Sequence, residues 1–91
     1  MKDVYVRKPS EAETTLLTSC SIWEHEVDQW DAEYDERCET CLVIEGTAVV
    51  TCEDGNAYAF TKGDLVTFRP HMKCVWKVLE PIKKHYIFDM K

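Results

Sequence analysis

The pair Cys38 and Cys41 is the first pattern in this sequence that could do chemistry, because C-x-x-C spacing occurs in zinc and redox sites. A zinc site needs four ligands, and the sequence has no second C-x-x-C and no nearby pair of histidines to complete one. The apolar run LVI at residues 42–44 follows at once and favours a strand, in which residues three positions apart point to opposite faces. We therefore reject a zinc knuckle here.

Composition and charge limit the protein's partners and surroundings. A formal net charge of −6 argues against nucleic acid and anionic membrane as partners, since both need a basic face. Five cysteines cannot all pair within one chain, and residues 1–13 lack the apolar segment of a secretory signal. No apolar run approaches the roughly 20 residues of a membrane span. We expect a cytoplasmic protein with reduced thiols.

Short strands separated by turn residues dominate the hydrophobic pattern. Only residues 10–17 resemble a helix, with Ser10 and Glu13 at capping-box spacing, and we expect at most one short helical turn there. Asp54-Gly55 indicates a hairpin with a primed turn, and Gly46 a tight turn between two further strands. The predicted strands are 4–7, 22–27, 29–34, 39–45, 47–53, 57–60, 65–68, 74–79 and 85–88. This order predicts one all-β domain, a sandwich or barrel, over residues 1–91.

Five segments together carry a resemblance to a known family: IWEHEV, ETCLVIEG, VTCEDG, KGDLVTF and CVWKVLEPIKKHY. Over nearly the whole chain, the sequence resembles a small single-domain cupin of the group related to the cupin domain of (S)-ureidoglycine aminohydrolase. The resemblance implies a double-stranded β-helix, or RmlC-like jelly-roll barrel, with a ligand cavity between its two sheets.

Metal-binding cupins carry the motif H-x-H-x(3,4)-E-x6-G and a third histidine from a second motif. This sequence keeps Glu39 and Gly46 but has another residue at every histidine position, and the second motif places Cys74 there. With a three-residue gap before Glu39, the first two positions fall on Glu33 and Asp35. Three carboxylates and one thiolate would then converge and could hold manganese, iron, nickel or zinc.

With a four-residue gap, the same two positions fall on Ala32 and Tyr34. Alternation favours this second register, because Trp30, Ala32 and Tyr34 form the apolar face of the segment. Burying the carboxylates between them without a metal would cost several kcal/mol each. The sequence therefore favours no metal cofactor, and it leaves the metal set Glu33, Asp35, Glu39 and Cys74 as the alternative.

Glu39 is the most informative remaining residue. Lys84 is a possible cationic partner for it, which would place an acid in an aromatic pocket able to bind a small polar ligand or move a proton. Glu39 could equally bond locally and close one end of the barrel. The candidate pocket residues are Tyr34, Glu39, Cys41, Cys74, Trp76, Lys84 and Tyr86.

These observations lead to three hypotheses for function. The first is a small-molecule-binding monocupin without the usual metal-binding histidines. The second is a metal-dependent enzyme of the (S)-ureidoglycine aminohydrolase type, and the third is a structural or interaction module with a filled barrel. The catalytic residues stay unknown, and so does whether the protein is an enzyme. The edge strand at residues 4–7 predicts pairing into a homodimer.

Overall fold

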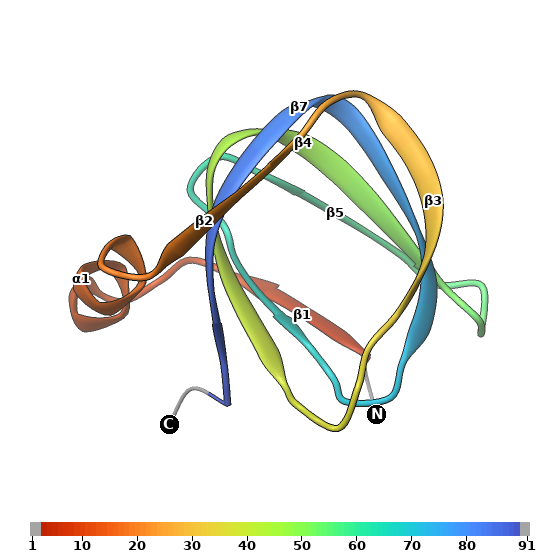
Figure 1. Cartoon of the computed structure of the whole chain (residues 1–91), viewed down its shortest axis with the longest axis horizontal. Coiled ribbons are helices and arrows are strands. Elements are labelled where there is room, and N and C mark those ends of the chain that lie inside the picture. The colour runs from red at the N-terminus through yellow and green to blue at the C-terminus, as the bar shows by residue number, and fades with distance from the viewer. Residues whose placement is uncertain (1–2, 90–91) are drawn as a thin grey trace.

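Seven strands and one helix make up the computed structural model, which describes residues 3–89 (Figure 1). Their content confirms an all-β fold with one short helix near the N-terminus. Within residues 3–89 there is no helix with the length and hydrophobicity that a bilayer crossing requires. The elements are β1 (Val4–Arg7), α1 (Glu11–Thr18), β2 (Ser21–His25), β3 (Asp28–Glu33), β4 (Glu39–Cys52), β5 (Ala57–Thr61), β6 (Leu65–Phe68) and β7 (Lys73–Phe88).

Two long strands, β4 and β7, hold the barrel together. They pair with each other in antiparallel fashion along most of their length. The first part of β4 also pairs with β6 and its last part with β5. The first part of β7 likewise pairs with β3 and its last part with β2. Because β4 and β7 each take part in both layers, the strands wrap around a common interior, as the jelly-roll expectation requires (Figure 1).

The prediction of a tight turn at Gly46 is wrong, because β4 continues through this residue without a break. The register of β4 against β7 shifts between Val43 and Ala48, which marks a bulge. Gly46 has a φ of +87°, and a Cβ atom built there would lie 2.1 Å from the backbone oxygen of Pro81. A bulge bends a strand instead of ending it. The two strands predicted at 74–79 and 85–88 are likewise one strand, β7, which passes the same bend at Pro81.

The hairpin expected at Asp54-Gly55 is confirmed, and it joins β4 to β5. Its turn type differs from the prediction. Gly55 is the only residue of the turn with a positive φ, whereas a type I′ turn needs two such residues. The Gly55 N–H donates to Cys52 O at 2.9 Å, and the Cys52 N–H donates to Asn56 O at 2.8 Å. This pattern fits a three-residue loop that ends in a left-handed glycine.

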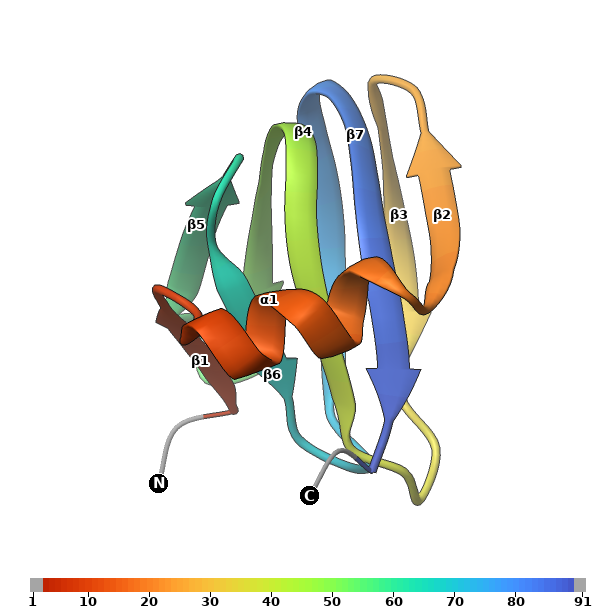
Figure 2. The same cartoon turned by 90° about the vertical axis from the view of Figure 1, so that its left-hand side faces the viewer.

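The helix α1 is eight residues long and so exceeds the single turn expected from the sequence. It begins with the predicted capping box, in which Ser10 and Glu13 each satisfy the other's backbone N–H. Figure 2 shows α1 lying across the outer face of the layer formed by β6, β4 and β7. Its Leu17 is fully buried there against Leu42 and Leu65. The helix therefore covers the outside of the barrel and leaves the interior free.

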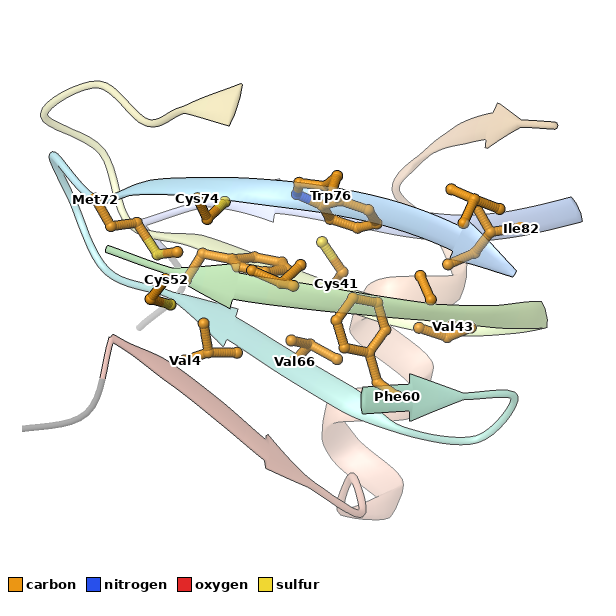
Figure 3. Packing of buried hydrophobic residues seen from close by; sticks show 14 residues of the cluster. Val4, Cys41, Val43, Cys52, Phe60, Val66, Met72, Cys74, Trp76 and Ile82 are labelled. Atoms are coloured by element: carbon orange, nitrogen blue, oxygen red, sulfur yellow. The ribbon is translucent and has the colours of Figure 1, made fainter. Parts of the chain in front are cut away.

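The main core fills the space between the two layers (Figure 3). Trp30, Ala32 and Tyr34 pack against this core, whereas the alternating carboxylates Asp31, Glu33 and Asp35 are exposed. The register chosen from the alternation of the sequence is therefore confirmed.

Candidate functional site

A pocket of about 400 Å³ opens between β2, β3, the start of β4 and β7. Half of its lining residues are aromatic, and the carboxylate of Glu39 and the ammonium group of Lys84 lie among them. Strand alternation explains this content, because every second residue of β2, β3 and β7 points inward. The lining comprises Trp23, Trp30, Ala32, Glu33, Tyr34, Asp35, Arg37, Glu39, Trp76, Lys84, Tyr86 and Phe88.

Three side chains from β4 and β7 form a hydrogen-bonded cluster within the barrel wall. Lys84 Nζ donates to Glu39 Oε2 at 2.7 Å and to Cys41 Sγ at 3.1 Å. The Cys41 thiol donates to the same Glu39 oxygen at 2.8 Å. The Lys84 side chain is 6% exposed and that of Glu39 12% exposed. This is a buried ion pair, whose partners depend on each other to offset the loss of hydration.

Aromatic rings surround the ammonium group on its other sides. Lys84 Nζ lies 4.9 Å from the ring centre of Trp23, 5.1 Å from that of Trp76 and 5.7 Å from that of Phe68. The negative faces of such rings attract a cation, most strongly where water is excluded. The rings therefore help to keep Lys84 charged inside the barrel.

Burial and neighbouring charges set the protonation of this cluster. Burial by itself acts to lower the pKa of Lys84, but the hydrogen bond to Cys41 and the charge of Glu39 act against it, and the pKa of Lys84 lies above its usual value. Burial also raises the pKa of the Cys41 thiol far above its usual value, so Cys41 is a neutral hydrogen-bond donor. The ion pair at the pocket therefore consists of the Lys84 ammonium group and the Glu39 carboxylate, and its net charge is zero.

Tyr34 lies beside this pair and contributes a hydroxyl group. Trp76 Nε1 donates to Tyr34 Oη at 2.9 Å, so the hydroxyl hydrogen of Tyr34 remains free to donate. Burial and the nearby Glu39 raise the pKa of Tyr34 well above its usual value. Tyr34 is therefore a neutral donor over the physiological pH range.

A second ion pair lies where the loop 34–38 reaches the pocket. Asp35 accepts hydrogen bonds from Nε and Nη2 of Arg37, the latter at 2.8 Å. The guanidinium carbon of Arg37 lies 3.9 Å from the ring centre of Phe88. Both charged side chains are about half exposed, so this pair adds little stability. This exposed pair lies at the solvent end of the pocket, whereas the pair of Lys84 and Glu39 is buried.

We expect the protein to lose stability steeply above about pH 9, because five buried groups resist deprotonation. The ordinary pKa values are 9.0 for cysteine, 10.0 for tyrosine and 10.5 for lysine, and each group has a raised pKa in the folded state. The folded state then holds protons that the unfolded state has released, so the free energy of unfolding falls as pH rises. Each such group contributes up to about 1.4 kcal/mol per pH unit. The five groups are Tyr34, Cys41, Cys52, Cys74 and Lys84.

Denaturant unfolding at pH 8, 9, 10 and 11 measures this decline. The variant Tyr34→Phe removes one of the five groups, and its free energy of unfolding should decline less steeply than that of the wild type, whatever its stability at pH 8. Tyr5→Phe, at an exposed tyrosine, is the matched control and should keep the wild-type slope. A free energy of unfolding that stays constant from pH 8 to 11 would contradict the expectation.

Comparison with known proteins places this barrel in a family. Residues 12–86 match the family model described as the EutQ-like cupin domain. The chain belongs to the EutQ-like cupin family. A DUF861 family protein from Thermotoga maritima is 44% identical and superposes with a TM-score of 0.85, over 92% of this chain and 97% of that one. No curated protein matches the sequence.

Two further solved structures share the fold. EutQ from Clostridium difficile has a TM-score of 0.68 at 19% identity, over 93% of this chain and 66% of that one. A putative ethanolamine utilization protein Q from Salmonella typhimurium has a TM-score of 0.66 at 15% identity, over 74% of this chain and 53% of that one. This EutQ-like cupin therefore corresponds to only part of the length of those two proteins.

The structure brings most of the predicted pocket residues together. Cys41 lies behind the pocket wall, bonded to both members of the ion pair. The placement of Cys74 in this pocket is wrong, because it lines a different hollow and lies opposite Cys52. The position that the second cupin motif assigned to Cys74 therefore does not reach Glu39. Five candidates line the pocket, namely Tyr34, Glu39, Trp76, Lys84 and Tyr86.

Sequence reasoning missed two lining residues, Trp23 and Arg37. Trp23 and His25 lie on the same face of β2, where their rings stack at 5.2 Å between centres, and the residues that alternate with them are exposed. That alternation in IWEHEV could have placed Trp23 inward. Arg37 gave no such signal, because it belongs to a loop that alternation does not describe.

The alternative metal set does not fit the geometry of this EutQ-like cupin. Glu33 and Asp35 are exposed, Cys74 lies in another hollow, and the ammonium group of Lys84 already sits against Glu39. Within the part of the chain that the structure describes, no three His, Cys, Asp or Glu side chains lie close enough to hold one ion. The four residues proposed as ligands are therefore not one site in this arrangement.

Proposed function

We propose that this EutQ-like cupin binds a small organic molecule in the aromatic pocket, with Glu39 accepting a hydrogen bond from it. The main observation in support of the proposal is that only one of the two carboxylate oxygens of Glu39 accepts hydrogen bonds from the protein. Oε2 accepts from Lys84 and from Cys41, whereas Oε1 has no hydrogen-bond partner among residues 3–89. No fully buried side-chain N or O atom of the described residues lacks a partner, so this unpaired oxygen is open to the pocket and free to accept a hydrogen bond. An N–H or O–H group of a ligand in the pocket would supply it.

The other walls narrow the chemistry of this ligand. The Tyr34 hydroxyl supplies a donor next to the Glu39 acceptor, which suits a ligand with neighbouring donor and acceptor atoms. The Trp23 and Trp30 rings offer flat apolar surface to a planar group. Lys84 and Glu39 cancel each other's charge, so the pocket interior favours a neutral molecule. A small planar amide or related neutral compound meets all three conditions, and a pocket of this size accommodates one.

Substitution of Glu39 by glutamine tests this proposal. We expect ligands found in a panel of small planar amides, such as nicotinamide and benzamide, to bind Glu39→Gln about 10- to 100-fold more weakly than wild type. This range corresponds to the roughly 1.5–3 kcal/mol of a hydrogen bond to a charged group. The fluorescence of the pocket tryptophans and the shift in melting temperature report binding.

The matched control is Glu33→Gln, which changes an exposed carboxylate at the edge of the same pocket. This variant should bind as the wild type does. Equal affinity of Glu39→Gln and wild type for a ligand that perturbs the tryptophans would contradict the role of Glu39. Failure of every planar amide would contradict the proposed ligand class.

The remaining expectations from the sequence have unequal support. The open pocket speaks against a module with a filled barrel. An activity of the (S)-ureidoglycine aminohydrolase type stays a prediction from sequence resemblance, and no contact among the described residues favours it. Pairing into a homodimer also stays a prediction, supported by β1, which pairs with β6 and leaves Tyr5 and Val6 exposed.

A further inference from the structure

Cys52 and Cys74 lie directly opposite each other on the neighbouring strands β4 and β7. Both side chains belong to the main core cluster, so they point to the same side of the sheet. Figure 3 shows them at one end of that core. Both cysteines are reduced in this structure. No other two cysteines are strand partners in the registers within residues 3–89.

The backbone hydrogen bonds show which kind of strand pair this is. The N–H and C=O groups of Cys52 bond toward β5, to Asn56 and Gly55. Met72, the residue before β7, accepts a hydrogen bond at its backbone oxygen from the Tyr34 N–H at 2.9 Å, so Cys74, two residues later, also directs its backbone groups toward β3. Neither cysteine thus uses its backbone groups between β4 and β7, and the two form a non-hydrogen-bonded pair.

Non-hydrogen-bonded pairs bring side chains closest. Their Cα atoms lie about 4.5 Å apart, which falls inside the range of about 4.4–6.8 Å found for disulfides. Their Cβ atoms are about 4.5–5.5 Å apart, so a disulfide here requires the strands to approach slightly. Such a bond is strained and correspondingly easy to reduce.

A small oxidant can reach the pair. The two side chains are 4% and 6% exposed, but both line a hollow on the surface between β3 and the β4–β5 hairpin. The same lining carries the carboxylates of Asp31, Glu33 and Glu53 against the single ammonium group of Lys73, so an anionic reagent approaches the pair slowly. The hollow is separate from the aromatic pocket, since the two share only Ala32 and Glu33.

We propose that Cys52 and Cys74 form a reversible disulfide when the protein meets a low-molecular-weight disulfide such as oxidised glutathione. One cysteine thiolate attacks a glutathione sulfur, and a glutathione thiolate leaves. The second cysteine, after losing its proton, attacks the protein sulfur of this mixed disulfide and releases the second glutathione. The protein is oxidised by two electrons, and one oxidised glutathione becomes two reduced molecules. The reverse exchange with a dithiol restores both cysteines.

The protonation of the two thiols sets the rate of this exchange. Burial raises the pKa of Cys74 to about 12 and also raises that of Cys52, so little thiolate exists at neutral pH. The thiolate fraction grows about tenfold per pH unit in this range, and the exchange should accelerate accordingly between pH 7 and 9. The pair therefore responds to sustained oxidising conditions and not to brief ones.

Thiol counting and peptide mapping on the full chain test the proposal. After incubation with oxidised glutathione and denaturation in the presence of an alkylating reagent, we expect three alkylated cysteines instead of five. Trypsin releases Cys74 in peptide 74–77 and Cys52 in peptide 38–62, and we expect these two peptides to be joined. Fragmentation of the joined peptides should place the link on Cys52, and dithiothreitol should restore five thiols.

Variants make the assignment specific. Cys38→Ser is the matched control, because it changes a cysteine of peptide 38–62 that has no cysteine opposite it, and it should still lose two thiols. Cys74→Val keeps the site apolar and should keep its four thiols free of any internal bond. Five free thiols in oxidised wild type, a stable mixed disulfide with glutathione, or a link to Cys38 or Cys41 would each overturn the proposal.

Discussion

Replacing Lys84 by methionine is expected to lower the free energy of unfolding by about 3–5 kcal/mol at pH 7. The substitution keeps a long apolar stem but removes the ammonium group that lies 2.7 Å from Glu39 Oε2. Glu39 would then be a buried carboxylate with only the Cys41 thiol as a donor to that oxygen. A domain of this size has a total stability of about 5–15 kcal/mol, so the loss would be a large part of it. Denaturant unfolding measures the change.

The double variant Lys84→Met/Glu39→Gln separates two contributions to the loss of stability, namely the loss of the ion pair and the cost of leaving one buried charge unpaired. It removes both charges at once and should be considerably more stable than Lys84→Met alone, since replacing a whole buried pair is often nearly neutral. Lys83→Met is the matched control, because Lys83 is the neighbouring lysine in a partly exposed pair with Glu24. Its change should stay within about 1 kcal/mol. If the double variant were no more stable than the single one, the unpaired carboxylate would not be the cause.

Replacing Gly46 by alanine is expected to cost about 4 kcal/mol or more, and to prevent folding in a less stable background. The residue has a φ of +87°, and an added Cβ would lie 2.1 Å from Pro81 O and 2.8 Å from Ile82 Cα. These are backbone atoms of β7, so relief requires β4 and β7 to separate where they bend together. The displaced segment leads directly to Lys84, and the ion pair with Glu39 would be disturbed as well.

Gly55 provides the matched control for this effect. It has nearly the same φ, +89°, but no atom lies within 4 Å of the position of a Cβ there. Gly55→Ala should therefore show only the backbone strain, about 1–2 kcal/mol. Denaturant unfolding of both variants gives the two values. Equal losses would mean that the left-handed backbone alone sets the cost at Gly46, and that the close approach of Pro81 does not matter.

Local patterns in the sequence were sufficient for the type of most elements. The capping box at Ser10, the Asp-Gly hairpin and the alternation of Trp30 and Tyr34 each depend on residues that are near one another in the chain. The extent of β4 and β7 was not predictable in this way. A glycine is compatible with a turn or with a bulge, and only the approach of Pro81 across the sheet decides for a bulge at Gly46.

The candidate site likewise has some features that local sequence patterns predict and others that depend on strand pairing. Alternation and the family resemblance were enough to propose Glu39 and Lys84 as pocket candidates, but they left open whether Glu39 instead bonds locally at one end of the barrel. Their meeting at 2.7 Å depends on the pairing of β4 with β7, which joins residues 45 positions apart. The pairing of β4 with β7 also places Cys74 opposite Cys52 and outside this pocket.

The sequence by itself determined that this chain has an all-β fold of cupin type, with the acid of the metal-binding motif kept and no histidine at the motif's histidine positions. Only the tertiary structure decided what replaces the cation next to that acid, namely the ammonium group of Lys84. It also decided which thiols are neighbours. The physical reason is that the alternation of side chains between the two faces of a strand is a local property of the sequence. Which residue lies opposite on the neighbouring strand depends on strand pairing and bulges, and these are set by many contacts between residues far apart in the chain.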